Sequence, residues 1–152
     1  MKLARPLYII MRNDTESLTP GKACAQAAHA ANDFMYVMSN SKMDSVINIA
    51  YNDWLEEAGT FGTTIVLGAT GDQINELNSL HLDFVIGIDL NPAVMFNKII
   101  DETYPISDGA ITHKVPFMTC AWVFAPEKLF FKSDAPYEYN QFVKIFNKLE
   151  LY

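Results

Sequence analysis

A buried strand followed at once by a long helix dominates the N-terminal part of the chain. Residues 7–11 read Leu-Tyr-Ile-Ile-Met and end in a polar stretch, which is typical of a strand covered on both faces. Thr19 and Pro20 then suit the N-cap and the first turn of a helix that extends to about Met38. Because layered α/β folds are built from strands that alternate with helices, this unit predicts a sheet with helices on its faces.

The rest of the chain continues the alternation. Helical spacing of apolar residues predicts further helices over residues 43–57, 71–80, 92–102 and 137–149. Apolar runs predict strands over residues 63–67 and 84–88, and one or two strands within 111–124, where Pro116 interrupts the pattern. We therefore expect a three-layer α/β/α sandwich around a small mixed β-sheet of about four strands. The expected domain is single and spans residues 1–152, with an added helical segment at about 127–152.

Length and charge narrow the class of protein. The chain has 152 residues and is 50% hydrophobic, which is enough for one sizeable core. Its formal net charge of -7 argues against a protein that coats DNA or RNA through a basic surface, although a local basic patch stays compatible with it. We find neither a secretory signal nor an apolar run of about 20 residues, so we expect a cytoplasmic protein outside the membrane. Cys24 and Cys120 lack metal-ligand spacing and are expected to be small apolar fillers.

A polar stripe runs along the first helix. It lies within about 60° of the helical wheel and consists of Lys22, Gln26, His29 and Asp33. The opposite side carries small or apolar residues that we expect to pack against a neighbour, namely Cys24, Ala27, Ala28, Ala31 and Met35. Lys22 lies in the first turn, where the helix dipole disfavours a cation by a few tenths to about 1 kcal/mol. Either Lys22 is simply solvated, or an anionic group such as a phosphate or a developing oxyanion sits at this helix end.

A second polar cluster follows a turn signal, Ser-Asp-Gly, at residues 107–109. Its members offer a carboxylate, hydroxyl groups, an imidazole and an ammonium group, and they are Asp108, Thr112, His113, Lys114 and Thr119. Asp108 either caps the turn or belongs to a site. His113 has no His or Cys at metal-ligand spacing, and the sequence has no phosphate loop, dinucleotide fingerprint or nucleophile elbow. We therefore expect neither a metal nor a cofactor.

Two motifs lie in these clusters. The first follows a strand, opens a helix and reads Arg12-x-Asp14, then Gly21-Lys22-x-x-x-Gln26-x-x-His29-Ala30. The second has Asp108, Thr112, Pro116 and Pro126 at fixed offsets. Across about residues 7–126 the chain resembles a divergent type-2 peptidyl-tRNA hydrolase. It departs from the family pattern at Gly109, Ala110, Ile111 and Cys120, and an inserted stretch before Asp108 makes Asp89 a competing candidate for the family's carboxylate.

The resemblance implies hydrolysis of the ester between a peptide and the 3′-terminal ribose of tRNA, with no metal or cofactor. It implies catalytic roles for Lys22, Asp108 and Thr112. Asp108 would orient or deprotonate water, and Lys22 would stabilise the oxyanion or bind a phosphate. The implied substrate-binding residues are Arg12, Gln26, His29, His113, Lys114 and Thr119. The family forms dimers, and we expect a homodimer here because of the aromatic residues Phe130, Phe131, Tyr137, Tyr139 and Phe142.

Two other interpretations stay open. The altered Asp-Gly-Ala-Ile-Thr at residues 108–112, Cys120 and the negative charge favour a hydrolase-like module that has lost turnover and binds RNA or a protein partner. A small-molecule hydrolase or transferase on the same fold would instead have a closed pocket near Lys22. The catalytic interpretation depends on one spatial prediction, that Lys22 and Asp108 meet in the same open cleft.

Overall fold

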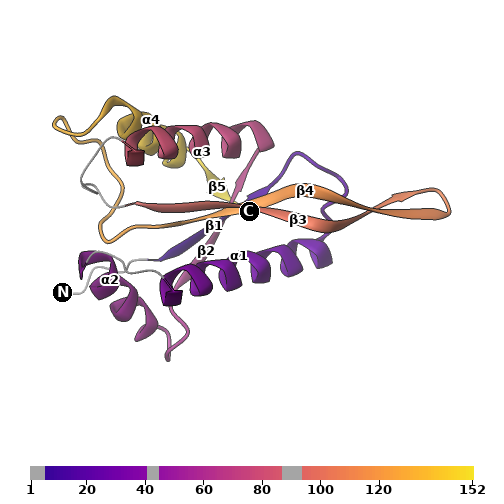
Figure 1. Ribbon diagram of the computed structural model, residues 1–152, viewed down its shortest axis with the longest axis horizontal. Coiled ribbons are helices and arrows are strands. Elements are labelled where there is room, and N and C mark those ends of the chain that lie inside the picture. Colours follow the sequence, from indigo (N-terminus) through magenta and orange to yellow (C-terminus); the bar gives the residue numbers. More distant parts are fainter. Residues whose placement is uncertain (1–5, 41–44, 87–93) are drawn as a thin grey trace.

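The computed structural model describes residues 6–40, 45–86 and 94–152 and confirms the predicted α/β class. A mixed, open sheet of five strands lies between two layers of helices (Figure 1). Its strands are β1 (Leu7–Arg12), β2 (Thr64–Ala69), β3 (Met95–Asp108), β4 (Ile111–Phe124) and β5 (Glu150–Leu151). The helices of the described part are α1 (Pro20–Asn40), α2 (Ser45–Leu55), α3 (Gly71–Ile86) and α4 (Tyr137–Phe146). In the strand order β3-β4-β1-β2-β5, β1 and β2 are parallel and the other neighbours are antiparallel.

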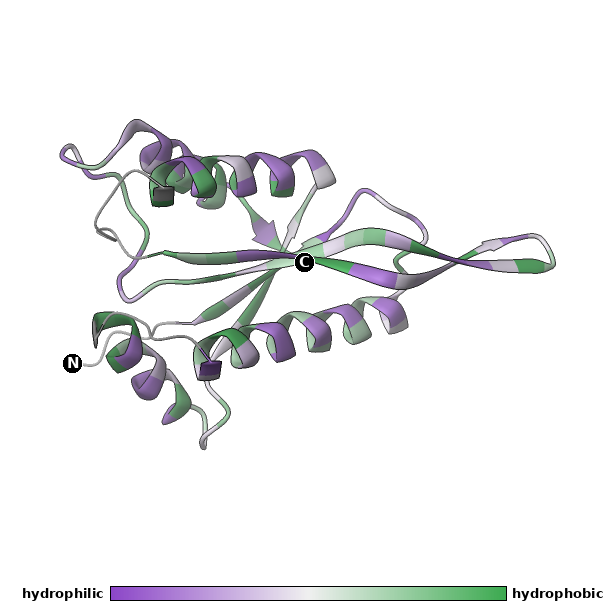
Figure 2. Cartoon of the chain, in the orientation of Figure 1, coloured by the Kyte–Doolittle hydropathy of each residue, from purple (hydrophilic) through white to green (hydrophobic). Residues whose placement is uncertain are grey.

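Strand β1 lies at the centre of the sheet and separates two hydrophobic clusters. Leu7, Ile9 and Met11 belong to the cluster under α1 and α2, whereas Ile10 belongs to the cluster under α3 and α4 (Figure 1). Side chains alternate between the two faces of a strand, and here helices cover both faces. This burial explains why residues 7–11 form a continuous apolar run. Figure 2 shows hydrophilic and hydrophobic residues alternating along the helices, as expected for helices with one buried face.

Strands β3 and β4 form a long antiparallel hairpin whose distal part extends beyond both helical layers (Figure 1). Each strand has 14 residues. The pairing register shifts between Ile99 and Ile100, and again between Asp101 and Tyr104. Pro116 lies opposite the second shift, where the ladder is already interrupted. Its missing N–H therefore removes no ladder hydrogen bond, and β4 continues as one strand through it.

The strand predicted over residues 84–88 is wrong. Residues 84–86 form the end of α3, which is longer than predicted, and residues 87–88 lie outside the described part. The physical reason is tertiary packing, because the Phe84 ring makes edge-to-face contacts with Tyr139 and Phe142 of α4. The predicted start of the second helix at Met43 also lies outside the described residues, which resume with α2.

The helix predicted over residues 92–102 is wrong as well. From Met95 onward this segment belongs to β3, and residues 92–93 lie outside the described part. Pairing with β4 decides its conformation, since Met95 to Ile99 pair residue by residue with the buried strand end at Phe124 to Cys120. The sheet also has five strands instead of four, because Glu150 and Leu151 add a short edge strand beside β2.

Helix α1 presents a different face to the sheet from the one we expected. Cys24, Ala28 and Met35 are exposed. The buried residues are Ala23, Gln26, Ala30, Phe34 and Met38. Phe34 explains this orientation, because its ring packs among aromatic rings of α2 and β4, namely Trp54, Trp122 and Phe124. Part of the polar stripe therefore faces the protein. The prediction of a buried apolar cysteine is confirmed for Cys120 and wrong for Cys24.

The C-terminal segment completes the second helical layer. Helix α4 packs beside α3 (Figure 1), and Tyr139 and Phe142 are buried in the cluster that they share. These two rings therefore do not belong to an exposed surface, whereas Phe130, Phe131 and Tyr137 are exposed and remain the candidates for self-association. Among the described residues, no helix has the length and apolar character needed to cross a membrane.

Candidate functional site

A buried glutamine joins α1 to the β3–β4 hairpin. Gln26 Nε2 donates a hydrogen bond to Asp101 Oδ2 at 2.7 Å, and Gln26 Oε1 accepts one from Thr119 Oγ1 at 2.8 Å. Gln26 is 3% exposed and Thr119 0% exposed. Cys120 adds an Sγ contact to the Gln26 carbonyl at 3.5 Å. Because each end of the amide has its own partner, the network fixes the orientation of Gln26 and ties α1, β3 and β4 together.

Asp101 is the carboxylate of this network. Its Oδ1 accepts hydrogen bonds from the Thr103 amide at 2.9 Å and from the Thr103 hydroxyl at 3.2 Å. The register shift between Asp101 and Tyr104 releases this amide from the ladder. Burial by itself would raise the pKa of Asp101, but the bonds from Thr103 and Gln26, together with the charge of His29, lower that pKa below its ordinary value. Asp101 is therefore ionised at neutral pH.

An open hollow of about 410 Å³ borders Asp101. It is lined by His29 and Asp33 of α1 and by residues 97–103 of β3. Asp33 is held in place there, since its Oδ2 accepts hydrogen bonds from Trp122 Nε1 at 2.7 Å and from Asn97 Nδ2 at 2.8 Å. The hollow offers room for a ligand beside a positioned carboxylate.

Lys22 lies against the backbone of β3. Its Nζ donates to the Pro105 carbonyl at 2.7 Å and lies 4.9 Å from the centroid of the Tyr104 ring. These contacts explain how a lysine is tolerated near the N-terminus of a helix. The ammonium is not fully solvated and pairs with no carboxylate of the described residues. A backbone carbonyl and an aromatic face balance the unfavourable helix dipole. We call the region of Lys22, Gln26, Asp101, Tyr104, Pro105 and Thr119 the hairpin base.

The other predicted catalytic residues lie farther out, in residues 106–114, which we call the hairpin tip. Asp108 and Thr112 flank the turn, and the Asp108 side chain is 86% exposed. His113 Nε2 lies 4.0 Å from Asp108 Oδ2. Within the described part of the chain Lys22 and Asp108 form no ion pair, and Lys114 is exposed at the end of the tip nearer the base.

Arg12 has a structural position at the end of β1. Its Nε and Nη2 donate to the two oxygens of Asp14 at 2.8 and 3.1 Å, and its Nη1 donates to the Met118 carbonyl at 3.3 Å. Asp14 Oδ2 also accepts the Gly71 amide at 3.0 Å, at the start of α3. The hydrogen bond from Arg12 lowers the pKa of Asp14, with a contribution from Gly71. A Cβ at Gly71 would lie 2.9 Å from Arg12 Cζ, so a larger residue there would have to displace the end of the Arg12 side chain.

The structure thus brings together one part of the predicted site and separates another. Gln26 and Thr119 meet directly, His29 lines the same hollow as Asp101, and Lys22, one turn before Gln26 on α1, contacts the backbone of β3 at Pro105. Asp101 was missed, because its segment was interpreted as helical. The available signal was Asp-x-Thr, a pattern in which the carboxylate binds the backbone two residues on. The competing candidate Asp89 lies outside the described residues.

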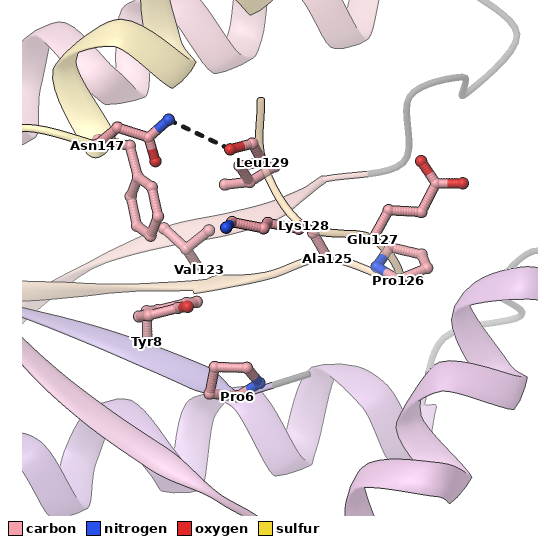
Figure 3. Close-up of a pocket in the computed structure, with 10 residues that line it drawn as sticks. Pro6, Tyr8, Val123, Ala125, Pro126, Glu127, Lys128, Leu129 and Asn147 are labelled. Atoms are coloured by element: carbon pink, nitrogen blue, oxygen red, sulfur yellow. Dashed lines mark hydrogen bonds between the residues drawn. The ribbon is translucent and has the colours of Figure 1, made fainter. Parts of the chain in front are cut away.

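A separate cavity of about 190 Å³ lies at the other end of the sheet (Figure 3). Its walls include Tyr8, Val123 and Leu129, and the Asn147 amide donates to the Leu129 carbonyl at 3.2 Å. Glu127 points away from its centre in this view. None of the predicted site residues lines this cavity.

The described residues contain no group of three or more His, Cys, Asp or Glu side chains arranged to hold a metal ion. Comparison with models of protein families gives no match, and the search of curated proteins finds no similar sequence.

Proposed function

We propose that this chain hydrolyses the ester bond of peptidyl-tRNA, and that the reaction takes place at the hairpin base. One observation carries the proposal: the helix that follows β1 places Gln26 in contact with both Asp101 and Thr119, with Lys22 on the same side of α1. A half-buried, hydrogen-bonded carboxylate at the edge of an open hollow, one helical turn along α1 from an ammonium group, is a suitable arrangement for activating water.

An ester needs few catalytic groups. Water must lose a proton as its oxygen attacks the carbonyl carbon, and the oxyanion that forms must be stabilised until the bond to the ribose oxygen breaks. Asp101 is ionised, and its Oδ2 accepts one hydrogen bond and keeps a lone pair that can orient the water and take its proton. The proton then passes to the leaving ribose oxygen, which becomes a hydroxyl group. Lys22 uses one N–H on Pro105 and has two left to donate to the oxyanion or to a phosphate.

Thr119 and Gln26 act through Asp101. The Thr119 hydroxyl already donates to Gln26 and is fully buried, so it does not reach a substrate. Its bond leaves the Gln26 amide N–H₂ directed at Asp101 Oδ2. We therefore assign both residues as positioning residues, and His29 as a polar residue that lines the same hollow as Asp101.

A second candidate function rests on the hairpin tip. Asp108 and Thr112 lie on an exposed projection, and the chain carries a net charge of -7. Both features favour a module that retains the hydrolase-like layers and uses the hairpin to contact RNA or a protein partner without turnover. The homodimer and the cytoplasmic location stay predictions.

The test is to incubate the protein with an N-blocked aminoacyl-tRNA and to follow the release of free tRNA. We expect turnover by the natural chain and a loss of about 100-fold or more in Lys22→Ala. Lys144→Ala, an exposed lysine of α4, is the matched control and should retain full activity. Substrate binding should also weaken steeply with salt, because phosphate contacts release counterions. Binding of tRNA without release would favour the second candidate, and full turnover by Lys22→Ala would remove the proposed site.

A further inference from the structure

The ammonium group of Lys22 rests on an aromatic ring that is itself completely buried. Lys22 Nζ lies 4.9 Å from the centroid of Tyr104, which is 0% exposed. The same Nζ donates to the carbonyl of the next residue, Pro105, at 2.7 Å. A ring face and a carbonyl from consecutive residues of β3 thus hold one cation.

The Tyr104 ring is fixed from its other side. It stacks on Phe117 of β4, with centroids 4.8 Å apart and an interplanar angle of 21°. Arg12 Cζ lies over the Phe117 ring, 4.9 Å from its centroid. The Tyr104 ring and the Arg12 guanidinium thus both lie against the Phe117 ring. Contacts between successive members therefore link Lys22, Tyr104, Phe117 and Arg12.

The Tyr104 hydroxyl adds a second anchor. It lies 3.2 Å from Ser17 Oγ, which in turn lies 2.9 Å from Thr15 Oγ1. Both hydroxyl residues belong to the segment between β1 and α1. This segment sets where α1 begins, so the hydroxyl of Tyr104 fixes the ring relative to the helix that carries Lys22.

These contacts restrict a side chain that is otherwise flexible. A lysine side chain has four rotatable bonds and loses rotamer freedom whenever its ammonium group must occupy one place. The ring face and the Pro105 carbonyl restrict it before any substrate binds, and two N–H groups stay available. Groups that are positioned in advance contribute more to a reaction than groups that must first be ordered.

We propose that Tyr104 is a positioning residue, whose ring holds the Lys22 ammonium at the hairpin base in the place where it acts. Phe117 and Ser17 hold the ring in turn. The inference rests on the proposed hydrolysis for its kinetic test, and on the contact between Lys22 and Tyr104 for its spectroscopic test.

The kinetic test is a double-mutant cycle with Lys22→Ala, Tyr104→Leu and the double variant, measured on an N-blocked aminoacyl-tRNA. We expect Tyr104→Leu to lower kcat about tenfold or more with a smaller change in KM. In the Lys22→Ala background the same change should lower kcat less than about twofold, because a residue that acts through Lys22 has nothing left to position. Tyr104→Phe keeps the ring face and should retain kcat within about threefold. Losses that multiply in the double variant would overturn the proposal.

A spectroscopic test does not need turnover. The ε-methylene protons of Lys22 lie beside an aromatic face, so their NMR signals should be shifted upfield in the natural chain and in Tyr104→Phe. Phe131→Leu, which changes an exposed ring elsewhere in the chain, is the matched control and should keep the shift. An unshifted Lys22 signal in the natural chain overturns the proposal even if Tyr104→Leu does not fold. An upfield shift in a protein that releases no tRNA would refute the proposed hydrolysis, while still showing that the ring holds the ammonium.

Discussion

The base and the tip of the β3–β4 hairpin carry similar chemical groups in different surroundings. At the base, Gln26, Asp101 and Thr119 come from three elements and are joined by hydrogen bonds of 2.7 and 2.8 Å. The side chains of Gln26 and Thr119 are almost fully buried. At the tip, Asp108 and His113 lie on the two strands that one turn joins, and both side chains are largely exposed. His113 Nε2 and Asp108 Oδ2 are 4.0 Å apart. Convergence of separate elements, more than the presence of suitable residue types, distinguishes a positioned site from a polar turn.

The comparison also shows what sequence offsets can hide. The spacing of Asp108, Thr112 and Pro116 resembles the pattern of a known family. In this chain, however, Asp108 and Thr112 lie at the hairpin tip. Asp101 has no such spacing, yet the fold directs Gln26 at it. We therefore expect changes at the base to affect both activity and folding, and changes at the tip to affect neither strongly.

The largest expected effect after loss of Asp101 itself is that of Gln26→Leu. This change leaves the buried Thr119 hydroxyl and the Asp101 carboxylate without their shared partner, and it should lower the free energy of unfolding by about 1–3 kcal/mol. Turnover should fall about tenfold or more, because the carboxylate loses its orientation. Urea denaturation and tRNA release measure the two effects. Ala28→Leu, on the exposed side of α1, is the control; equal losses in both variants would contradict the network.

An intermediate effect is expected from pH. The pKa of Asp101 is lowered in the folded chain, so its charge stabilises the fold above the ordinary aspartate pKa of about 3.9, and that contribution is lost as the pH falls through the lower, folded value. The difference in unfolding free energy between the natural chain and Asp101→Asn should therefore be constant near neutral pH and shrink below about pH 4.

Urea denaturation at several pH values measures this difference, and Asp108→Asn provides the comparison at the tip. A difference for Asp101→Asn that grows as the pH falls would have the wrong sign for a lowered pKa and would contradict the hydrogen-bond network.

The smallest effect is expected from removing the tip. Ile106 and His113 are partners in the ladder, so residues 107–112 can be replaced by Asn-Gly, which forms a two-residue hairpin turn. Hydrolysis should stay within about threefold of the natural chain, since the base is unchanged. A shortened hairpin that folds, as judged by its urea midpoint, but no longer releases tRNA would move the site to the tip.

Much of the fold was accessible from the sequence. The run at residues 7–11 identified the central strand because burial on both faces leaves a continuous apolar pattern. Thr19 and Pro20 identified the start of α1. Gln26 and Thr119 were also selected as site residues, and they do meet, although the sequence alone did not show that both are buried.

The missing part has one physical origin. Segment 95–102 lacks a local signal for a strand, because its conformation follows from pairing with β4. The spacing of its apolar residues, taken alone, predicts a helix. Because the sequence predicts a helix over this segment, it gives Asp101 no partner on a neighbouring strand. The sequence therefore pairs Lys22 with Asp108, the carboxylate of the second motif. The rotation of α1 had a similar cause, because Phe34 packs among distant aromatic rings.

The most direct measurement compares Asp101→Asn with Asp108→Asn in the release of tRNA from an N-blocked aminoacyl-tRNA. Each change removes one carboxylate charge with almost no change in shape. Our account predicts that Asp101→Asn lowers kcat/KM about 100-fold or more, as loss of a general base does, while Asp108→Asn stays within about threefold of the natural chain. The reverse order would contradict the assignment of the reaction to the hairpin base.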